Sequence, residues 1–214
     1  MFDLTDDDHR LKILGCGDGP AAFNAEATRR GVQVVSCDPI YRLETAQIRQ
    51  RIAATYDDIL DQVRSNAEAF LWDSIRSVED LGRLRMAAMQ EFLEDYGSGT
   101  TKGRYVAAEL PTLPFANTAF DLALCSHFLF LYTTQLGEAF HRLAIREMCR
   151  VAAEVRIFPL LALGGGPSPL VSIMVRDLRD WGYEVSLEDV PYEFQRGAHT
   201  MLRVRPYRRP GVYS

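Results

Sequence analysis

The sequence has no hydrophobic run of the length found in membrane proteins and no leader typical of secreted ones. No window approaches the roughly 20 apolar residues that a helix needs to cross a bilayer. The first ten residues, MFDLTDDDHR, are acidic, whereas a secretory signal starts basic and continues apolar. We therefore expect a cytoplasmic protein that has no membrane partner.

Cysteine is scarce, and the four cysteines form no C-x-x-C pair and lie near no histidine cluster. This spacing argues against disulfides and against a structural metal, so we expect no metal site. Cys16, Cys37 and Cys125 each fall near the end of a predicted strand. A thiol cluster beside His127 is conceivable, although buried free cysteines more commonly act as small apolar side chains.

An excess of positive charge is also missing, because 29 acidic residues outnumber 24 lysines and arginines and leave a net charge of −5. No general positive field attracts a phosphate backbone, although a local basic patch remains open. Nucleic acid is thus a disfavoured partner without being excluded. The sequence leaves the oligomeric state open.

The composition that is present suits a single domain spanning 1–214, since 47% of the 214 residues are hydrophobic. Several apolar runs are typical of parallel strands that helices bury on both faces. A helix over 21–31 that stops at Gly31 joins the first two runs, and an amphipathic helix over 135–153 joins the last two. The runs cover residues 11–16, 32–38, 104–110, 120–132 and 154–163.

The C-terminal part departs from this alternation. An amphipathic helix over 170–182 is followed by strand-like segments at 183–194 and 200–207, with the polar turn QRGAH between them. Two strands joined in this way form an antiparallel hairpin. We therefore predict an α/β fold, a doubly wound, mostly parallel Rossmann-like sheet of about seven strands that ends in an antiparallel hairpin.

Residues 42–102 are too many for a simple crossover between strands two and three. Apolar residues recur at helical spacing from Ile48 to Leu71, and a second helix is expected from Ser77, which can cap it with Asp80 at the reciprocal capping position. The glycine-containing segment 96–103 is expected to end that helix. We interpret 42–102 as a helical insertion that covers the ligand end of the sheet as a lid.

The first strand runs into ILGCGDGPAAF, which places Gly15, Gly17 and Gly19 on alternate positions. Such a loop lets the backbone approach a ligand closely, at the edge where open α/β sheets bind their ligands. The dinucleotide fingerprint needs a small residue where this chain has Pro20, and the lysine of a phosphate loop is absent. Both phosphate-binding interpretations, including an NAD-linked oxidoreductase, are therefore disfavoured.

Asp38 closes the second predicted strand. A carboxylate at that position can accept hydrogen bonds from both ribose hydroxyls of a ligand that lacks a 2′-phosphate. The residues alone therefore indicate a nucleoside ligand without specifying which one.

With these motifs in place, the chain resembles the class I S-adenosylmethionine-dependent methyltransferases. The resemblance lies in ILGCGDG after strand one, VVSCDP at the end of strand two, and AAELPTLPFANTAFDLALCSH through strands three and four. It covers roughly residues 11 to 205, including the final hairpin. Each piece is weak alone, whereas their order and spacing together are fairly specific.

The resemblance implies S-adenosylmethionine as the cofactor and gives each matching residue a role. Glu109 and the adjoining Leu110 stand where the family places an acid toward the adenine amino group. Ser126 and His127 line the floor beside the sulfonium. The remaining positions are Gly15, Gly17 and Gly19 beside the methionine moiety, Asp38 on the ribose and Ile40 against adenine.

One position departs from the family pattern. An acid usually precedes the first glycine by two residues, and Ile13 stands there in this chain. Asp18, inside the loop, could supply the missing negative charge for the methionine ammonium group. The alternative is a non-catalytic protein that keeps the fold and binds S-adenosylmethionine or a nucleoside, or serves as a partner subunit.

The methyl acceptor is the least defined part of the prediction. No N-P-P-Y follows strand four, and no Pro-Cys pair of the cytosine-modifying type is present. Together with the negative charge, these absences favour a small molecule or a protein as acceptor. His127 could take a proton from the acceptor as a general base, although a histidine at this edge is more often a wall residue.

Overall fold

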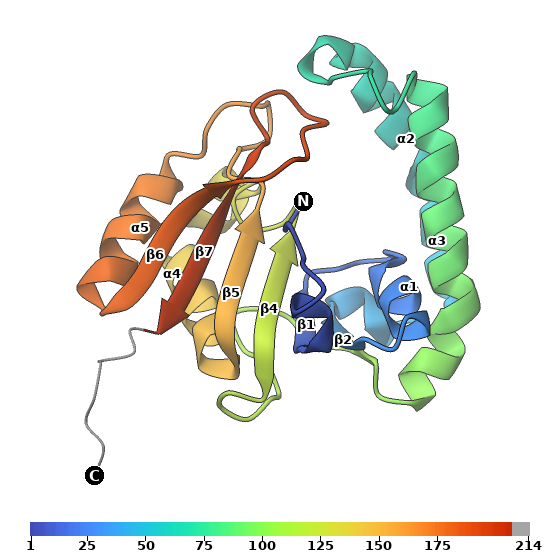
Figure 1. Cartoon of the computed structure of the whole chain (residues 1–214). Helices are drawn as coiled ribbons and strands as arrows, with labels where there is room; N and C mark the ends of the chain where they lie inside the picture. Colours follow the sequence, from blue (N-terminus) through green and yellow to red (C-terminus); the bar gives the residue numbers. More distant parts are fainter. Residues whose placement is uncertain (207–214) are drawn as a thin grey trace.

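The computed structural model describes residues 1–206, and residues 207–214 of the predicted domain lie outside this part. A single sheet has the strand order β3-β2-β1-β4-β5-β7-β6 (Figure 1). The strands are β1 Lys12–Cys16, β2 Gln33–Cys37, β3 Tyr105–Val106, β4 Phe120–Ser126, β5 Ala152–Phe158, β6 Tyr183–Asp189 and β7 Thr200–Pro206. The helices are α1 Phe23–Arg29, α2 Thr45–Ser65, α3 Val78–Thr101, α4 Thr133–Val151 and α5 Leu170–Asp180, with short 3-10 turns at Asp8–Arg10, Pro39–Arg42 and Ala67–Ala69.

The strand directions confirm the predicted fold class. β1 pairs in parallel with β2 and β4, and β7 runs antiparallel to both β5 and β6. The chain moves from β1 outward to β3 and then returns to place β4 on the other side of β1. The carboxyl ends of β1 and β4 therefore form a switch point, where open α/β sheets bind ligands.

Apolar side chains cover both faces of the central strands, as the near-continuous runs predicted. On one face, Leu14, Ala123 and Val155 are buried in the cluster that includes the inner sides of α4 and α5. On the other face, Ile13 and Leu122 pack with residues of α1 and of the N-terminal segment. These strand positions are apolar on both sides because neither face of the central sheet meets water.

Several predicted strands are shorter in the structure than the sequence indicated, including β3, β4, β5 and β6. β3 contains only Tyr105 and Val106, because the chain leaves its single partner β2 and turns through a proline-containing segment. β4 ends at Ser126, because His127 takes a left-handed backbone conformation with φ of 52°. The His127 N–H then donates to the Phe158 carbonyl, 2.7 Å away, and the chain turns toward α4.

Helices α2 and α3 form the predicted pair between β2 and β3, and we call residues 45–101 the arm. Ser77 caps α3 by accepting a hydrogen bond from the Asp80 N–H at 3.1 Å. The helix ends at Thr101, within the segment 96–103 that was expected to end it, but only after it has passed through Gly99. Gly99 lies so close to the side chains of Tyr105 and Arg104 that a Cβ would collide with them, so this glycine serves packing inside the helix.

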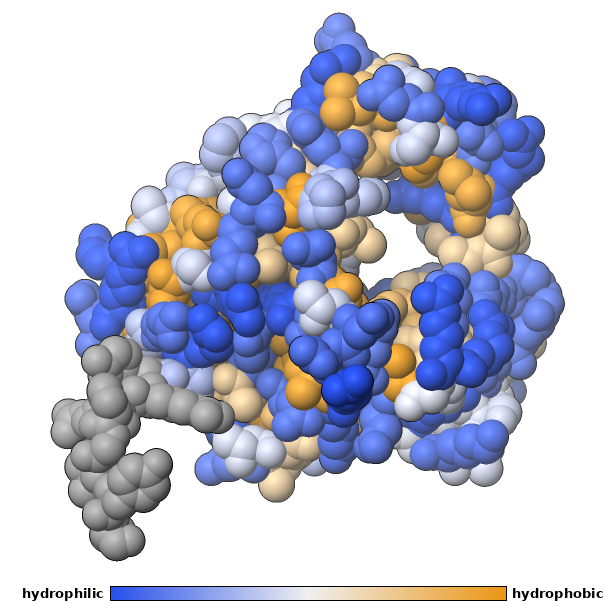
Figure 2. All heavy atoms as spheres, in the orientation of Figure 1, coloured by the Kyte–Doolittle hydropathy of each residue, from blue (hydrophilic) through white to orange (hydrophobic). Residues whose placement is uncertain are grey.

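The arm rises away from the sheet and returns to it at the tip (Figure 1). At the tip, the Leu71 N–H donates to the Phe194 carbonyl at 2.7 Å, and the Arg196 N–H donates to the Ala69 carbonyl at 2.9 Å. The loop between β6 and β7 thus holds the tip, and an opening passes through the molecule between arm and sheet (Figure 2). Within residues 1–206, no helix is long and apolar enough to cross a membrane.

Candidate functional site

The glycine loop lies at the switch point, between β1 and α1. Gly17 has a φ of 71° and donates its N–H to the Cys37 carbonyl of the neighbouring strand at 2.9 Å. A Cβ at this position would lie 3.1 Å from the ring of Phe128, which follows β4. Glycine is needed here both for the left-handed backbone and for the close approach of the ring.

Asp18 turns back beneath the loop instead of pointing into water. Its carboxylate occupies the side of Gly15 where a Cβ would otherwise stand, and it accepts a hydrogen bond from the Ser36 hydroxyl at 2.5 Å. Burial, together with the nearby negative charge of Asp38, raises the pKa of Asp18 to about 7. No cation pairs with this carboxylate within residues 1–206.

Asp38 stands where β2 ends and uses both carboxylate oxygens to shape the site. Oδ2 accepts from the Gly19 N–H at 2.9 Å, and Oδ1 accepts from the Ile40 N–H at 2.8 Å. Burial raises the pKa of Asp38, while these two hydrogen bonds oppose the rise. Each oxygen still has a lone pair available for a ligand hydroxyl.

Tyr41 is a site residue that the sequence analysis did not select. Its hydroxyl donates to the Gly19 carbonyl at 2.7 Å, so the ring holds the glycine loop from the side of the arm. The ring is buried among Phe92, Tyr96 and Tyr105, with centroid distances of 5.3 to 6.0 Å. The base of the arm is therefore connected directly to the loop. The sequence feature that could have identified Tyr41 is its position three residues after Asp38, the acid that follows β2.

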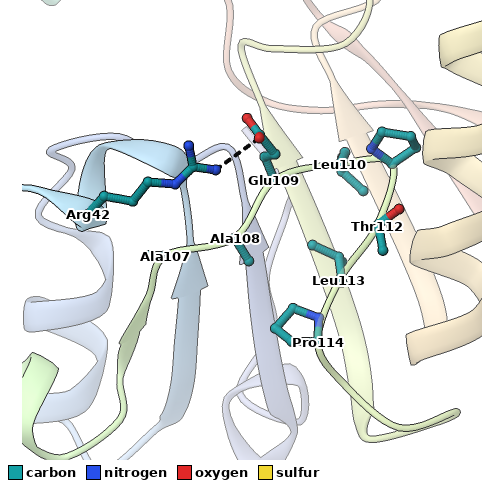
Figure 3. A pocket seen from close by; sticks show the side chains of 9 residues that line it. Arg42, Ala107, Ala108, Glu109, Leu110, Thr112, Leu113 and Pro114 are labelled. Atoms are coloured by element: carbon teal, nitrogen blue, oxygen red, sulfur yellow. Dashed lines mark hydrogen bonds and ion pairs between the residues drawn. The ribbon is translucent and has the colours of Figure 1, made fainter.

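Glu109 lies in the segment after β3, beside two hollows at the sheet edge. Figure 3 shows Arg42 reaching across from the segment after β2, where its Nη2 lies 2.9 Å from Glu109 Oε1. A hollow of about 500 Å³ is lined by Arg42 and residues 107–114, which include the buried Leu110. A second one, of about 380 Å³, is lined by Asp38, Ile40 and neighbouring residues. Both volumes lie in the range of small-molecule sites.

Ser126 ends β4, and His127 follows it, on the other side of the loop. The Ser126 hydroxyl and His127 Nδ1 lie 2.8 Å apart. The surrounding protein lowers the pKa of His127 to about 4 through desolvation and the nearby charge of Arg85, although the imidazole keeps solvent-accessible surface. This histidine is therefore neutral near pH 7 and accessible to a ligand.

The four cysteines are free and buried. Cys16 lies beside Cys37, whose thiol together with burial raises the pKa of Cys16 well above its usual value. Burial raises the pKa of Cys125 to about 12. Thiols in this state act as small apolar side chains beneath the loop. In the described part of the chain, no group of three or more His, Cys, Asp or Glu is arranged to hold a metal ion.

The structure brings most of the predicted site residues to one edge. The glycines, Asp18 and Asp38 form one continuous set of contacts, and Ile40, Glu109 and Leu110 line the adjoining hollows. Ser126 and His127 lie beyond Phe128, which packs on the loop. The residues that the sequence did not reveal are Tyr41, Ser36, Phe128 and Arg42.

Comparison with solved structures supports this geometry at the level of the fold. The PH0226 protein of Pyrococcus horikoshii superposes with a TM-score of 0.51, at 10% identity, over 92% of this chain and 82% of that chain. The 1,6-didemethyltoxoflavin-N1-methyltransferase of Burkholderia thailandensis, with bound 1,6-didemethyltoxoflavin and S-adenosylhomocysteine, superposes with a TM-score of 0.50, at 12% identity, over 92% and 72%. Identities this low show a shared fold and nothing about the ligand.

Comparison of sequences identifies a relative of similar length. The uncharacterized protein MJ0045 of Methanocaldococcus jannaschii is 31% identical over 206 residues, which are 96% of this chain and 90% of that protein. No family model matches the sequence. The chain therefore belongs to the same family as MJ0045 and has the fold of the class I S-adenosylmethionine-dependent methyltransferases.

Proposed function

We propose that the protein is an S-adenosylmethionine-dependent methyltransferase that acts on a small-molecule acceptor. One observation carries the proposal: two carboxylates, Asp18 and Asp38, are held under and beside a glycine loop at the switch point of the sheet. Asp18 is partly buried and has no cationic partner in residues 1–206. A carboxylate in that state fits a ligand that brings a positive charge into the loop.

The residues fit the parts of the cofactor one by one. Asp18 would accept the methionine ammonium group, in place of the acid that the family usually has at the position of Ile13. Asp38 would accept the ribose hydroxyls with its remaining lone pairs. Ile40 and Leu110 would contact adenine in the hollows that Arg42 and Glu109 border. With Asp18 in this role, Ile13 no longer argues against a methyltransferase, which we therefore favour over a non-catalytic binding protein.

The cofactor supplies a methyl group on a sulfonium, which an acceptor can attack directly. The chain's contribution is to hold the acceptor in line and to keep water away. The opening between arm and sheet offers room for the acceptor (Figure 2). With a pKa of about 4, His127 can accept a proton only weakly, so we assign it the role of a wall and hydrogen-bonding residue.

The Burkholderia methyltransferase, which shares the fold, contains bound 1,6-didemethyltoxoflavin in its structure, so a small acceptor is compatible with this fold. The negative net charge points the same way, since it disfavours a polyanionic nucleic acid. A protein acceptor is less favoured, because the arm tip closes the opening into a ring, which restricts the entry of a folded chain.

Calorimetry tests the proposal directly. S-Adenosylmethionine and S-adenosylhomocysteine should each bind, and the binding of either ligand between pH 6 and 7 should release protons, because the ammonium group favours the ionised form of Asp18. Repeating the titration in buffers of different ionisation enthalpy counts those protons. Absence of binding by both ligands at millimolar concentration would reject the proposed function.

A further inference from the structure

Gly19 closes the glycine loop, and two hydrogen bonds of its own backbone hold it in place. Its N–H donates to Asp38 Oδ2 at 2.9 Å, and its carbonyl accepts from the Tyr41 hydroxyl at 2.7 Å. The backbone is left-handed, with φ of 57°, and within residues 1–206 no atom beyond its chain neighbours lies within 4 Å of the place where a Cβ would stand. Because glycine has no side chain to pack and is conformationally permissive, these hydrogen bonds fix the end of the loop.

Tyr41 is a firm anchor for that carbonyl. Its ring is buried and packs on the rings of Phe92, Tyr96 and Tyr105. The Tyr96 hydroxyl lies 3.0 Å from the carbonyl oxygens of both Tyr41 and Leu43, so α3 also holds the backbone of this turn. Burial and the nearby carboxylates raise the pKa of Tyr41, so its hydroxyl keeps its proton and donates it to the loop.

The part of the loop that Tyr41 holds carries Asp18. The backbone before Asp18 is held by the Gly17 N–H, which donates to the Cys37 carbonyl at 2.9 Å. The backbone after Asp18 is held through Gly19, by the Tyr41 hydroxyl on one side and by the carboxylate of the neighbouring strand on the other. A side chain anchored at the base of the arm therefore helps to set the position of the Asp18 carboxylate.

We propose that Tyr41 is a positioning residue for the amino-acid half of S-adenosylmethionine. It acts through Gly19, because a loop that is already ordered presents Asp18 to the ammonium group without a further cost of ordering. The adenosine half depends less on this contact, since Asp38 keeps the hydrogen bond from the Ile40 N–H when the end of the loop moves. This inference rests on the proposed function, because it concerns the binding of the same cofactor.

The test compares two ligands on the variant Tyr41→Phe, which removes the hydroxyl and keeps the ring in its cluster. S-Adenosylhomocysteine contains both halves of the cofactor, whereas 5′-methylthioadenosine contains the adenosine half without the amino-acid group. In calorimetry near neutral pH, the variant should bind S-adenosylhomocysteine about fivefold more weakly than the wild type does, and its affinity for methylthioadenosine should change by less than about twofold. A merely structural role of Tyr41 would weaken both ligands alike.

Tyr105→Phe is the matched control. The Tyr105 ring lies in the same cluster, 5.3 Å from that of Tyr41, and its hydroxyl donates to Asp95 of α3 at 2.8 Å. This variant also loses one phenol hydrogen bond from the base of the arm, but none from the loop. It should keep the wild-type affinity for both ligands, and thermal unfolding checks that both variants are folded.

Hydrogen exchange of the ligand-free protein gives a second readout that does not depend on the cofactor. In Tyr41→Phe, the Gly19 N–H should exchange about fivefold faster, because the end of the loop opens more often. The Gly17 N–H, which donates to the Cys37 carbonyl, should keep its rate. Both rates should stay at the wild-type values in Tyr105→Phe.

The outcomes separate this inference from the proposed function. If the wild type does not bind S-adenosylhomocysteine, the proposed function fails, and the inference fails with it. If the wild type binds it and Tyr41→Phe binds it equally well, or loses affinity for both ligands equally, the inference is wrong and the methyltransferase proposal stands. The same loss in Tyr105→Phe, or an unchanged exchange rate of the Gly19 N–H, would also overturn it.

Discussion

The sheet edge and the arm tip are held by different kinds of contact. At the edge, the carboxylates of Asp18 and Asp38 accept hydrogen bonds from Ser36, Gly19 and Ile40. The arm tip is held by aromatic contacts with the β6–β7 loop. Since the two sets of contacts share no residue, changes at the edge should alter cofactor binding and changes at the tip should alter the docking of the arm.

The largest expected effect comes from Asp18 at the edge. Its pKa is raised from 3.8 when unfolded to about 7 when folded, so the folded state keeps a proton that the unfolded state loses. The stabilising contribution of Asp18 to the free energy of unfolding is fully present below pH 4 and is lost as the pH rises through 7. The side chain introduced by Asp18→Asn cannot ionise, so the variant does not lose this part of its free energy of unfolding as the pH rises. The variant should exceed the wild type by up to about 4 kcal/mol at pH 8.

Urea unfolding of both proteins at several pH values between 4 and 8 measures this difference. Carboxylates with lowered pKa values, such as Asp8 and Asp95, also make the free energy of unfolding depend on pH. Both proteins contain them, so their contribution cancels in the difference between wild type and variant. S-Adenosylhomocysteine should stabilise the wild type more than the variant at pH 8. Parallel pH profiles would mean that Asp18 is ionised in the folded protein.

Asp38→Ala should weaken S-adenosylhomocysteine binding by about 2 kcal/mol, because two charge-assisted hydrogen bonds to the ribose are lost. The Gly19 and Ile40 N–H groups also lose their acceptor, so the loop itself loosens. Asp38→Asn should have a smaller effect, since its carbonyl can still accept one of these bonds. Calorimetry gives both affinities, and unchanged values would place the ribose elsewhere.

The edge could be predicted from the sequence because its residues act locally. A glycine loop after a buried strand and an acid at the end of the next strand meet wherever two parallel strands are adjacent, and β1 and β2 are adjacent here. The position of the Asp18 carboxylate was not predictable, since it depends on the absence of a side chain at Gly15 and on the Ser36 hydroxyl of another strand.

The arm could be predicted only as two helices. Helical periodicity cannot say that the tip returns to the β6–β7 loop, because the aromatic contact with Phe194 joins residues more than 100 positions apart.

The arm tip gives the next effect in size. Phe194 packs on Phe70 and Trp72, with centroid distances of 5.1 and 5.5 Å. Phe194→Ala should destabilise the docked tip by about 1 kcal/mol and leave the sheet intact. In a Trp181→Phe background, Trp72 fluorescence should shift to longer wavelength, and the Leu71 N–H should exchange about fivefold faster.

Leu84→Ala is the matched control for the tip, because Leu84 is an exposed apolar residue on α3 outside the contact. It should leave both the fluorescence and the exchange rate unchanged. Cofactor affinity should be the same in both variants, as the separation of tip and edge requires. A large loss of S-adenosylhomocysteine binding on Phe194→Ala would show that the tip and the cofactor loop are coupled, with Tyr41 at the arm base as the connecting residue.

The smallest effect is expected at Glu109. Its carboxylate forms an ion pair with Arg42, which lies between β2 and the arm. Both side chains are more than half exposed, so Glu109→Gln should change stability by less than about 0.5 kcal/mol. If Glu109 accepts from the adenine amino group, the wild type should bind S-adenosylhomocysteine about fivefold tighter than S-inosylhomocysteine, which has a carbonyl there. The side-chain amide introduced by Glu109→Gln can donate to that carbonyl, so the variant should lose the preference. A preference that survives the substitution would assign adenine recognition to backbone groups of the same segment.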